Sequence, residues 1–441
     1  MEWALAIVAL ALLGVGAVSA RLPGSPITPA MLFVTFGLLV GPAVLGGIDL
    51  SSVGSTVQML ANATLALVLF CDASRVHLRE LRREVGLPAR LLGIGLPLTI
   101  ALGAVAAALI FGELTAAEGV ILAVVLAPTD AALGQAVVTE PRVPPRIRQG
   151  LNVESGLNDG ICVPLLFAAV AVADVESAIS EGRSPAALLF EEIGFGVVGG
   201  LVGGLVAAAI VVRAGRRHLI DNAWRQVIPA AGAALAYGTA SALGGSGFIA
   251  AFVAGITFRL VIRRDPGPIN ELSEQVGNVL NGCTFVLFGA VLLGPAIGDL
   301  DWKLVLYAVL SLTLVRMLPV AIAMLGTHAR AATLGFLGWF GPRGLASIVF
   351  AVIVVEESNL PHEHLIVVAI YLTVGLSVFA HGLTAAPLAA RYADWYEQHP
   401  RDAAPSMETV PAQVTRVRGP AGQLRTHPDQ PASGESDPQV D

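Results

Sequence analysis

Long apolar runs recur along the chain from Trp3 almost to Ala390, and each is about as long as a helix that crosses a lipid bilayer. The composition agrees, because 55% of the 441 residues are hydrophobic and only 13% are charged, whereas soluble domains carry roughly 25% charged residues. The runs are too long, and alternate too little, for the strands of a membrane barrel. The sequence therefore predicts an all-α polytopic membrane protein and excludes most soluble folds.

A window of about 20 mostly apolar residues marks about thirteen predicted transmembrane helices. They lie near 3–20, 27–46, 55–72, 88–111, 115–140, 149–172, 186–213, 222–242, 247–263, 271–295, 301–325, 331–357 and 362–391. The transmembrane domain, 1–391, thus divides into six helices within 3–172, a linker helix at about 186–213, and six helices within 222–391. From Tyr392 the chain turns polar and proline-rich, which predicts a disordered tail over 392–441.

The basic residues predict how these helices are oriented, because cytoplasmic loops are enriched in arginine and lysine. With an external N-terminus, 18 of the 26 basic residues lie in loops or helix ends on the cytoplasmic side, and only Arg183 and Lys303 lie on the external side. Of the other six, four are in the tail and two, Arg316 and Arg343, are inside predicted helices. The asymmetry predicts an external N-terminus and a cytoplasmic tail in the cell (inner) membrane. No basic run suggests a nucleic-acid partner.

Two of the predicted helices are interrupted at corresponding places. The fifth contains Pro128-Thr129-Asp130, and the second-to-last contains Gly341-Pro342-Arg343-Gly344. Proline removes a helical hydrogen bond, and glycine lowers helix propensity. Each interrupted helix is the fifth of its set of six, and the linker helix gives the two sets opposite orientations. This arrangement is typical of transporters built from two inverted repeats, with discontinuous helices crossing near the membrane midplane.

Ionisable side chains inside the predicted helices are functional candidates, because each costs at least about 2.5–3.5 kcal/mol at bilayer depth. They are Asp72, Asp130, Glu154, Asp159, Arg316 and Arg343. Four acids against two arginines leave an excess negative charge that a cation, protons or both would neutralise. We expect Glu154 to be a structural partner of Arg316 or Arg343, because an unpaired buried arginine is costlier than an acid that can take up a proton.

The densest cluster of polar residues is Glu154-Ser155-Gly156-Leu157-Asn158-Asp159. On a helix, Ser155 lies one turn from Asp159, and Glu154 lies one turn from Asn158. Oxygen ligands of this kind suit a small hard cation, and the break at Thr129 would release backbone carbonyls nearby. A cation and a proton that compete for one buried carboxylate are the minimum that exchange requires.

These residues resemble a known family. Glu-Ser-Gly-Leu-Asn-Asp-Gly at 154–160, preceded by Ala127-Pro128-Thr129-Asp130, is similar to the hallmark of the NhaP/NHE-type monovalent cation/proton antiporters. Leu-Phe-Cys-Asp ending at Asp72, Val-Arg-Met-Leu-Pro-Val around Arg316 and Gly-Pro-Arg-Gly-Leu-Ala-Ser around Arg343 match further family stretches. The resemblance covers about residues 5–390. It implies a thirteen-helix inverted-repeat fold, a homodimer, and alternating access by a core domain that moves against a dimerisation domain.

The resemblance also implies the roles of single residues. Asp159 would bind the cation or the proton, and four residues would lie near it: Ser155, Asp130, Thr129 and Asp72. Asn158, in place of a second aspartate, is associated in this family with electroneutral one-for-one exchange. The implied activity is exchange of Na+, or else Li+ or K+, for H+ in pH homeostasis, with no cofactor.

Alternatives from the same fold and from other classes remain at this point. The first is a K+/H+ antiporter of the same fold, and the second is a cation channel or a sensor. The third is an intramembrane aspartyl protease that would use Asp130 and Asp159 as a general acid/base dyad, although the Gly-x-Gly-Asp and Pro-Ala-Leu motifs of such proteases are absent. His381, in the last predicted helix, is interpreted as a hydrogen-bonded core histidine and not as a proton relay.

Overall fold

The structure, a computed structural model, describes residues 2–22, 24–41, 54–75, 86–173, 185–262, 267–357, 360–399 and 408. Within these ranges the regular structure is entirely helical, as predicted. Six helical stretches are long and apolar enough to cross a membrane: Gly86–Ile110, Pro145–Ala173, Phe190–Ala214, Ile269–Asp299, Trp302–Ala323 and Glu363–Glu397. Shorter apolar helices, such as Pro29–Val40 and Gly247–Ile262, lie beside them.

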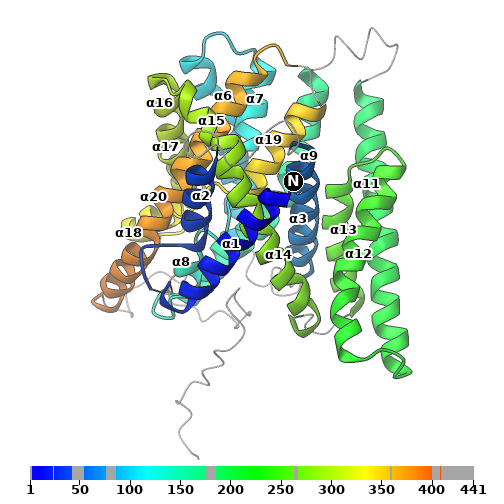
Figure 1. Ribbon diagram of the computed structural model, residues 1–441. Coiled ribbons are helices and arrows are strands. Elements are labelled where there is room, and N and C mark those ends of the chain that lie inside the picture. Colours follow the sequence, from blue (N-terminus) through cyan, green and yellow to red (C-terminus); the bar gives the residue numbers. More distant parts are fainter. Residues whose placement is uncertain are drawn as a thin grey trace, which may run out of the picture.

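The helices up to Ala173 are α1 (Glu2–Val18), α2 (Pro29–Val40), α3 (Gly54–Arg75), α5 (Gly86–Arg90), α6 (Leu96–Ile110), α7 (Ala116–Val125), α8 (Gln135–Thr139) and α9 (Pro145–Ala173). Those that follow are α11 (Pro185–Ala209), α12 (Asn222–Ala242), α13 (Gly247–Ile262), α14 (Gly267–Leu287), α15 (Gly294–Ala296), α16 (Trp302–Leu312), α17 (Leu314–Ala323), α18 (Ala331–Trp339), α19 (Leu345–Glu357) and α20 (Glu363–Glu397). Figure 1 shows them running up and down through one bundle.

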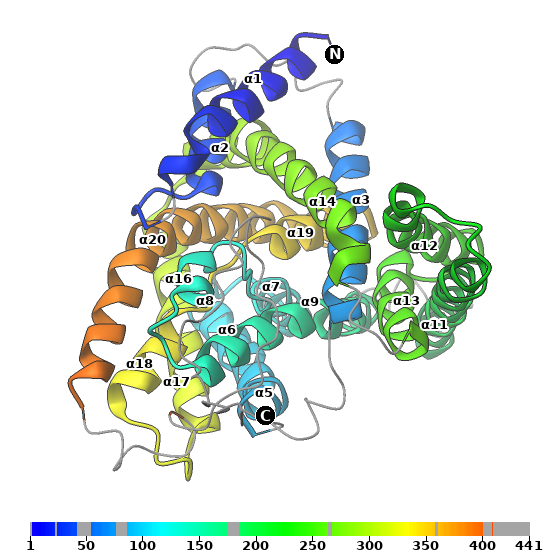
Figure 2. The same ribbon diagram turned by 90° about the horizontal axis from the view of Figure 1, so that it is seen from below.

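Three helices, α11, α12 and α13, form a group at one side of the bundle, and α3 and α14 lie between this group and the rest (Figures 1 and 2). Glycines on α11 bring these helices close together. A Cβ on Gly203 would lie 2.7 Å from the Cβ of Ala236 on α12, and one on Gly200 would lie 2.6 Å from the carbonyl oxygen of Ala250 on α13. Side chains would not fit at either contact, so small residues set the helix spacing.

Both predicted helix interruptions are present in the structure. The chain leaves the helix after Val125 and resumes helix at Gln135, and it leaves helix again after Trp339 and resumes at Leu345. Pro128 and Pro342 lie inside the two gaps, where each lacks the N–H that a continuous helix needs. The prediction of two discontinuous helices is confirmed.

The predicted helix over 301–325 is confirmed as the apolar stretch Trp302–Ala323, within which one irregular turn divides α16 from α17. The division falls at Thr313, whose backbone (φ −110°, ψ −93°) departs from helical geometry. The Thr313 hydroxyl donates to the carbonyl of Val309, 2.6 Å away, and such a side-chain bond bends helices. The division places Arg316 in the first turn of α17.

The predicted start of the disordered tail at 392 is also corrected by the structure. Helix α20 continues to Glu397, and its last turns bury Tyr392 and Tyr396. Tyr392 stacks on Phe336 of α18, with ring centroids 4.1 Å apart. The prediction rested on the polar composition of residues 392–441 as a whole, and that composition does not show the packing of these few aromatic side chains. Glu408 is buried as well, and the rest of the predicted tail, 400–407 and 409–441, lies outside the described residues.

Helix α9 passes through the middle of the bundle and packs on α3, α7, α13 and α19. Its first half carries the polar cluster that the sequence predicted, from Glu154 to Asp159. The second half is apolar and packs in the core through Cys162, Val163 and Leu166. The polar cluster is therefore enclosed by helices from both halves of the chain.

Candidate functional site

The polar side chains of α9 are buried although all of them are hydrophilic. Glu154, Ser155, Asn158 and Asp159 are each less than a tenth exposed, with Asp159 at 8%. Buried polar groups must find partners within the protein. This part of α9 meets the first break at Thr129, α3 at Asp72 and α17 at Arg316.

Ser155 and Asn158 hold the first break against α9. The Ser155 hydroxyl donates to the carbonyl oxygen of Thr129, 2.5 Å away. The Asn158 side-chain amide donates to the hydroxyl of Thr129, 2.7 Å away. The carbonyl oxygen Oδ1 of Asn158 is buried without a hydrogen-bond partner in the part of the chain that the structure describes. Hydroxyl and carbonyl oxygens thus gather where the backbone is unwound.

Asp72 approaches the same part of α9 from α3. A Cβ added to Gly156 would lie 3.5 Å from the Cβ of Asp72 and 3.9 Å from its carboxyl carbon. Asp72 is half-buried. Gly156 is within one turn of Asp159 on α9. Asp72 of α3 therefore lies at about the same height along the α9 axis as Asp159.

Asp130 lies next to Thr129, and its carboxylate bonds to the start of α19, just beyond the second break. Its backbone N–H donates to the carbonyl of Pro342, 2.7 Å away. One carboxylate oxygen accepts from the N–H of Leu345 at 3.2 Å, and the other accepts from the N–H of Ala132 at 2.8 Å. A negative charge at the first residue of α19 is favourable, because helix N-termini present unpaired N–H groups.

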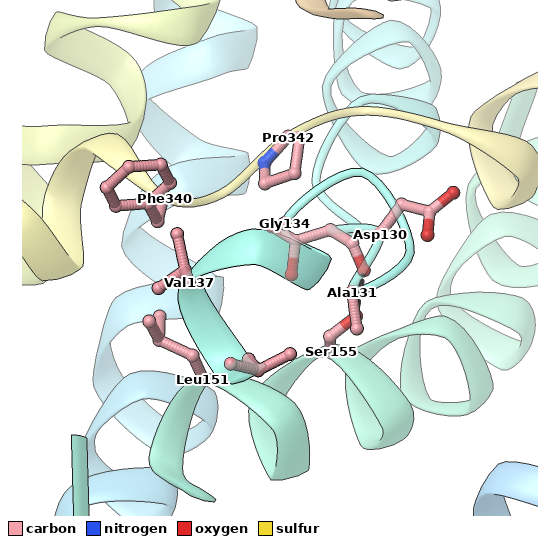
Figure 3. A pocket seen from close by; sticks show the side chains of 10 residues that line it. Asp130, Ala131, Gly134, Val137, Leu151, Ser155, Phe340 and Pro342 are labelled. Carbon is pink, nitrogen blue, oxygen red and sulfur yellow. Dashed lines mark hydrogen bonds between the residues drawn. The ribbon is translucent and has the colours of Figure 1, made fainter. Parts of the chain in front are cut away.

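Gly344 makes this crossing possible. A Cβ at Gly344 would lie 2.1 Å from the carboxylate oxygen Oδ2 of Asp130. Figure 3 shows the segment with Pro342 passing over the loop that carries Asp130 and Gly134. The two breaks therefore cross in direct backbone contact.

Glu154 pairs with Arg316. The Arg316 guanidinium donates to both carboxylate oxygens, at 2.6 and 2.9 Å. The two residues are 2% and 3% exposed. The sequence left open which arginine meets Glu154, and the structure assigns it to α17.

Arg343 is fully buried between the breaks. Its Nη1 donates to the carbonyl of Gly341 at 3.1 Å and to that of Ala127 at 3.4 Å. Among the described residues its Nε and Nη2 have no hydrogen-bond partner. These carbonyls lie just beyond the C-terminal ends of α18 and α7, where a positive charge is favourable.

A small pocket lies beside the crossing (Figure 3). Thr129, Asp130 and Ser155 form its polar part, whereas Val137, Val138, Leu151 and Phe340 form an apolar wall. In Figure 3 the Asp130 carboxylate points away from Leu151 and Val137. The pocket thus connects the Ser155–Thr129 contact to an apolar region between α8, α9 and the second break.

Two serines that the sequence analysis passed over also hold the breaks. The hydroxyl of Ser347 on α19 donates to the carbonyl of Val125, the last residue of α7, at 2.8 Å. The hydroxyl of Ser377 on α20 accepts from the N–H of Arg343 at 2.7 Å. Both serines are fully buried. The available signal was a hydroxyl within an apolar helix, where it needs a partner.

The model of one protein family, described as sodium/hydrogen exchanger, transmembrane, matches residues 6–391. A K+/H+ antiporter NhaP from Alkalimonas amylolytica is 26% identical over 381 residues, which are 84% of this chain and 63% of that protein. An Na+/H+ antiporter from Schizosaccharomyces pombe is 26% identical over 262 residues, 55% of this chain and 54% of that protein. The chain thus spans less than two thirds of the length of these relatives.

A solved structure has a similar fold. The sodium proton antiporter MjNhaP1 from Methanocaldococcus jannaschii, at pH 8, superposes with a TM-score of 0.72 at 20% identity. The superposition covers 86% of this chain and 98% of that one. The family match extends across nearly all of the helical region, including both breaks and α9. The chain therefore belongs to the sodium/hydrogen exchanger family, a family of multi-pass membrane transporters and not of enzymes.

Proposed function

We propose that this protein is a secondary antiporter that exchanges a monovalent cation, with Na+ favoured, for H+. One observation carries the proposal: buried Asp159 adjoins Ser155 and Asn158, which bond to the carbonyl and to the hydroxyl of Thr129 in the first break. A buried carboxylate is costly when charged, so either a bound proton or a bound cation stabilises it. Competition of the two for Asp159 couples their movements in opposite directions.

The proposed cation ligands are oxygen atoms. Asp159 supplies the charge, and Ser155 and Thr129 supply neutral oxygens. Asp130 adds negative charge at the crossing, and Asp72 adds it from α3. Hard oxygen donors of this type suit an alkali cation better than a soft metal.

One-for-one, electroneutral exchange follows from the local charges. Glu154 is neutralised by its ion pair with Arg316, and Asn158 carries no charge. Asp159 is then the one group of the α9 cluster left to alternate between a proton and a cation. Exchange by such a site moves no net charge, so we expect its rate not to depend on an imposed membrane potential.

We propose alternating access within an inverted-repeat architecture, in a homodimer embedded in the lipid bilayer of the cell (inner) membrane. The crossing of the breaks provides a region whose backbone is not committed to a continuous helix, and such regions line transport pathways. The pocket beside Ser155, with its wall at Leu151 and Phe340, is a section of the route from one side. The arginine distribution supports an external N-terminus and a cytoplasmic tail.

The test is exchange by the purified protein in vesicles with an imposed pH gradient. Addition of Na+ should collapse the gradient between about pH 6 and 9, and Asp159→Asn should abolish the response. Asp301→Asn, at an exposed acid before α16, is the matched control and should behave as the wild type. No response of the wild type to any alkali cation would overturn the antiport proposal. Undiminished exchange by Asp159→Asn would overturn only the role of Asp159.

Potassium is the second candidate cation, because the bacterial relative at 26% identity is named a K+/H+ antiporter. The same vesicles, tested with Na+, Li+ and K+ at equal concentrations, rank the three cations. A voltage-driven current without proton movement would instead indicate the channel alternative. Membership of a transporter family argues against the protease alternative.

A further inference from the structure

Helix α20 carries a buried serine–histidine pair that contacts both ends of the second break. Ser377 and His381 are one helical turn apart, and His381 is 1% exposed. The N–H of Arg343 donates to the Ser377 hydroxyl oxygen at 2.7 Å. His381 Nε2 lies 2.9 Å from the carbonyl oxygen of Trp339. The two side chains therefore bracket the unwound residues 340–342.

The partners determine where the histidine proton lies. The Trp339 carbonyl can only accept, so Nε2 must be the protonated nitrogen. Nδ1 then accepts from the Ser377 hydroxyl, 3.2 Å away. In the other neutral tautomer Nδ1 would donate to the Ser377 carbonyl at 3.1 Å, but the lone pair of Nε2 would face the Trp339 oxygen. A neutral ring with its proton on Nε2 donates to the Trp339 carbonyl and accepts from the Ser377 hydroxyl.

The result is one continuous chain of hydrogen bonds. It runs from the Arg343 N–H through the Ser377 hydroxyl to the His381 ring, and from that ring to the Trp339 carbonyl. Backbone groups at broken helix ends lack helical partners, and inside a membrane water does not replace them. The Ser377–His381 pair supplies one partner on each side of the break: Ser377 for the Arg343 N–H and His381 for the Trp339 carbonyl.

Trp339 is held by two further contacts with α20. Its ring stacks on His381, with centroids 4.9 Å apart. Its indole N–H donates to the hydroxyl of Thr384 at 3.0 Å. The C-terminal end of α18 is thus fixed to α20 through both the backbone and the side chain of one residue.

The break held in this way carries the groups that meet Asp130. Pro342 accepts from the Asp130 N–H, and Gly344 leaves room for its carboxylate. A change in the path between Trp339 and Arg343 would move both groups. Displacement would pass through Asp130 to its neighbour Thr129, which bonds to Ser155 and Asn158.

We propose that Ser377 and His381 are positioning residues for cation/proton exchange, which hold the second break in the conformation that supports the Thr129 contacts. The inference rests on the proposed antiport function. Neither residue contacts Thr129 or the α9 cluster in the hydrogen bonds of the described part of the chain. They act through the backbone of 339–343 and not on the transported ion.

The test compares Ser377→Ala, His381→Phe and the double variant with the wild type. His381→Phe keeps a ring to stack on Trp339 but removes its N–H donor, and His381→Gln restores a donor. Thr373→Val is the matched control, because Thr373 is a buried hydroxyl one turn earlier on α20 that bonds to the Ala369 carbonyl of its own helix. The readouts are exchange rate against cation concentration and backbone amide hydrogen exchange across residues 339–345.

We expect each single variant to lower the exchange rate by about 10- to 100-fold and to speed hydrogen exchange at the Arg343 amide. The double variant should lose little more than the worse single variant, because the two residues act as one unit. His381→Gln should recover much of the rate, and Thr373→Val should match the wild type in both readouts.

Wild-type transport and amide protection in Ser377→Ala and His381→Phe would overturn the inference. An equal loss in Thr373→Val would also overturn it, because the effect would then be general destabilisation of α20. Failure of the antiport proposal is distinguishable from failure of this inference. If the antiport proposal fails, the wild type itself is inactive in vesicles, but the amide protection at Arg343 still shows whether Ser377 and His381 hold the second break.

Discussion

Arg316 and Glu154 face each other inside the bundle in a two-point ion pair, with Nη1 to Oε1 at 2.6 Å and Nη2 to Oε2 at 2.9 Å. The pair joins α17 to α9 at the residue before Ser155. Two parallel bonds fix the relative orientation of both side chains. Because both ions are removed from water, their attraction offsets the desolvation cost only while both are present.

Removing one partner of this ion pair should destabilise the protein strongly. Glu154→Gln leaves the Arg316 charge buried and unpaired, and we expect it to lower the free energy of unfolding by about 3–5 kcal/mol. The double variant Glu154→Leu/Arg316→Met should recover most of this loss, because it buries no charge. Unfolding of the detergent-purified variants measures both effects. A double variant with the summed loss of the two single variants would contradict the prediction.

Gly344→Ala should disrupt the crossing of the two breaks. The new methyl group would lie 2.1 Å from the Asp130 carboxylate oxygen and 2.6 Å from its Cβ, so either the carboxylate or the backbone must move. We expect a loss of about 1–3 kcal/mol of stability, as for other overpacked sites, and a clear loss of exchange. Vesicle transport and thermal unfolding measure these effects.

The control for this variant is Gly335→Ala in the neighbouring helix α18. A Cβ there would meet nothing within 4 Å, so the substitution should be neutral or stabilise by about 0.4–1 kcal/mol through reduced freedom of the unfolded chain. Equal effects of the two substitutions on stability and transport would show that neither depends on the close approach of Gly344 to Asp130.

Local rules account for what the sequence could predict. The interruptions at Pro128 and Pro342 follow from the chemistry of proline inside an apolar run, and the hydrophobic runs themselves mark most of the helices. The polar face of α9 follows from helical spacing between Ser155 and Asp159. Each of these inferences needs only residues within a few turns of one another.

Contacts between distant segments could not be predicted in the same way. Glu154 and Arg316 are 162 positions apart. The sequence spacing did not distinguish Arg316 from Arg343 as the partner of Glu154. The sequence placed Asp130 beside a break but did not indicate that its carboxylate would bond to Leu345 in the other half of the chain. The hydroxyl of Ser377 inside an apolar helix indicated a need for a partner but not which one, because that partner is a backbone N–H that becomes available only where another helix ends.

Glu118 should contribute to the stability of the contact between the first turn of α7 and the start of α20. Its carboxylate accepts from the N–H and the hydroxyl of Thr115, at 2.8 and 2.9 Å, and from the N–H of His362 at 2.9 Å. The bond to Thr115 is a capping box that the sequence could predict, whereas the bond to His362 crosses 244 positions. Glu118→Ala removes the acceptor that the N–H and hydroxyl of Thr115 and the N–H of His362 share.

We expect Glu118→Ala to lower the free energy of unfolding by about 1.5–3 kcal/mol, the range for hydrogen bonds to a charged group. Glu113→Ala, at an exposed acid five residues earlier, is the control and should change stability little. Thermal unfolding of both variants in the same detergent makes the comparison. Similar melting temperatures for the two would show that the Glu118 network adds nothing.

Glu408 should hold the start of α18. Its carboxylate oxygen Oε1 accepts from the N–H of Arg330 at 3.1 Å and from the hydroxyl of Thr333 at 2.7 Å, and its backbone carbonyl accepts from the Tyr396 hydroxyl at 2.8 Å. A carboxylate at a helix N-terminus satisfies N–H groups that have no helical partner. Helix α18 is therefore anchored at its start by Glu408 and at its end by α20.

Glu408→Ala leaves the Arg330 N–H and the Thr333 hydroxyl without this acceptor, and we expect a loss of about 1.5–3 kcal/mol of stability. Faster amide hydrogen exchange should be confined to the first turn of α18, because the bonds of Trp339 to α20 are unchanged. Glu397→Ala, at an exposed acid in the last turn of α20, is the control and should leave both measurements at wild-type values. Unchanged protection of α18 in Glu408→Ala would show that the helix does not depend on this anchor.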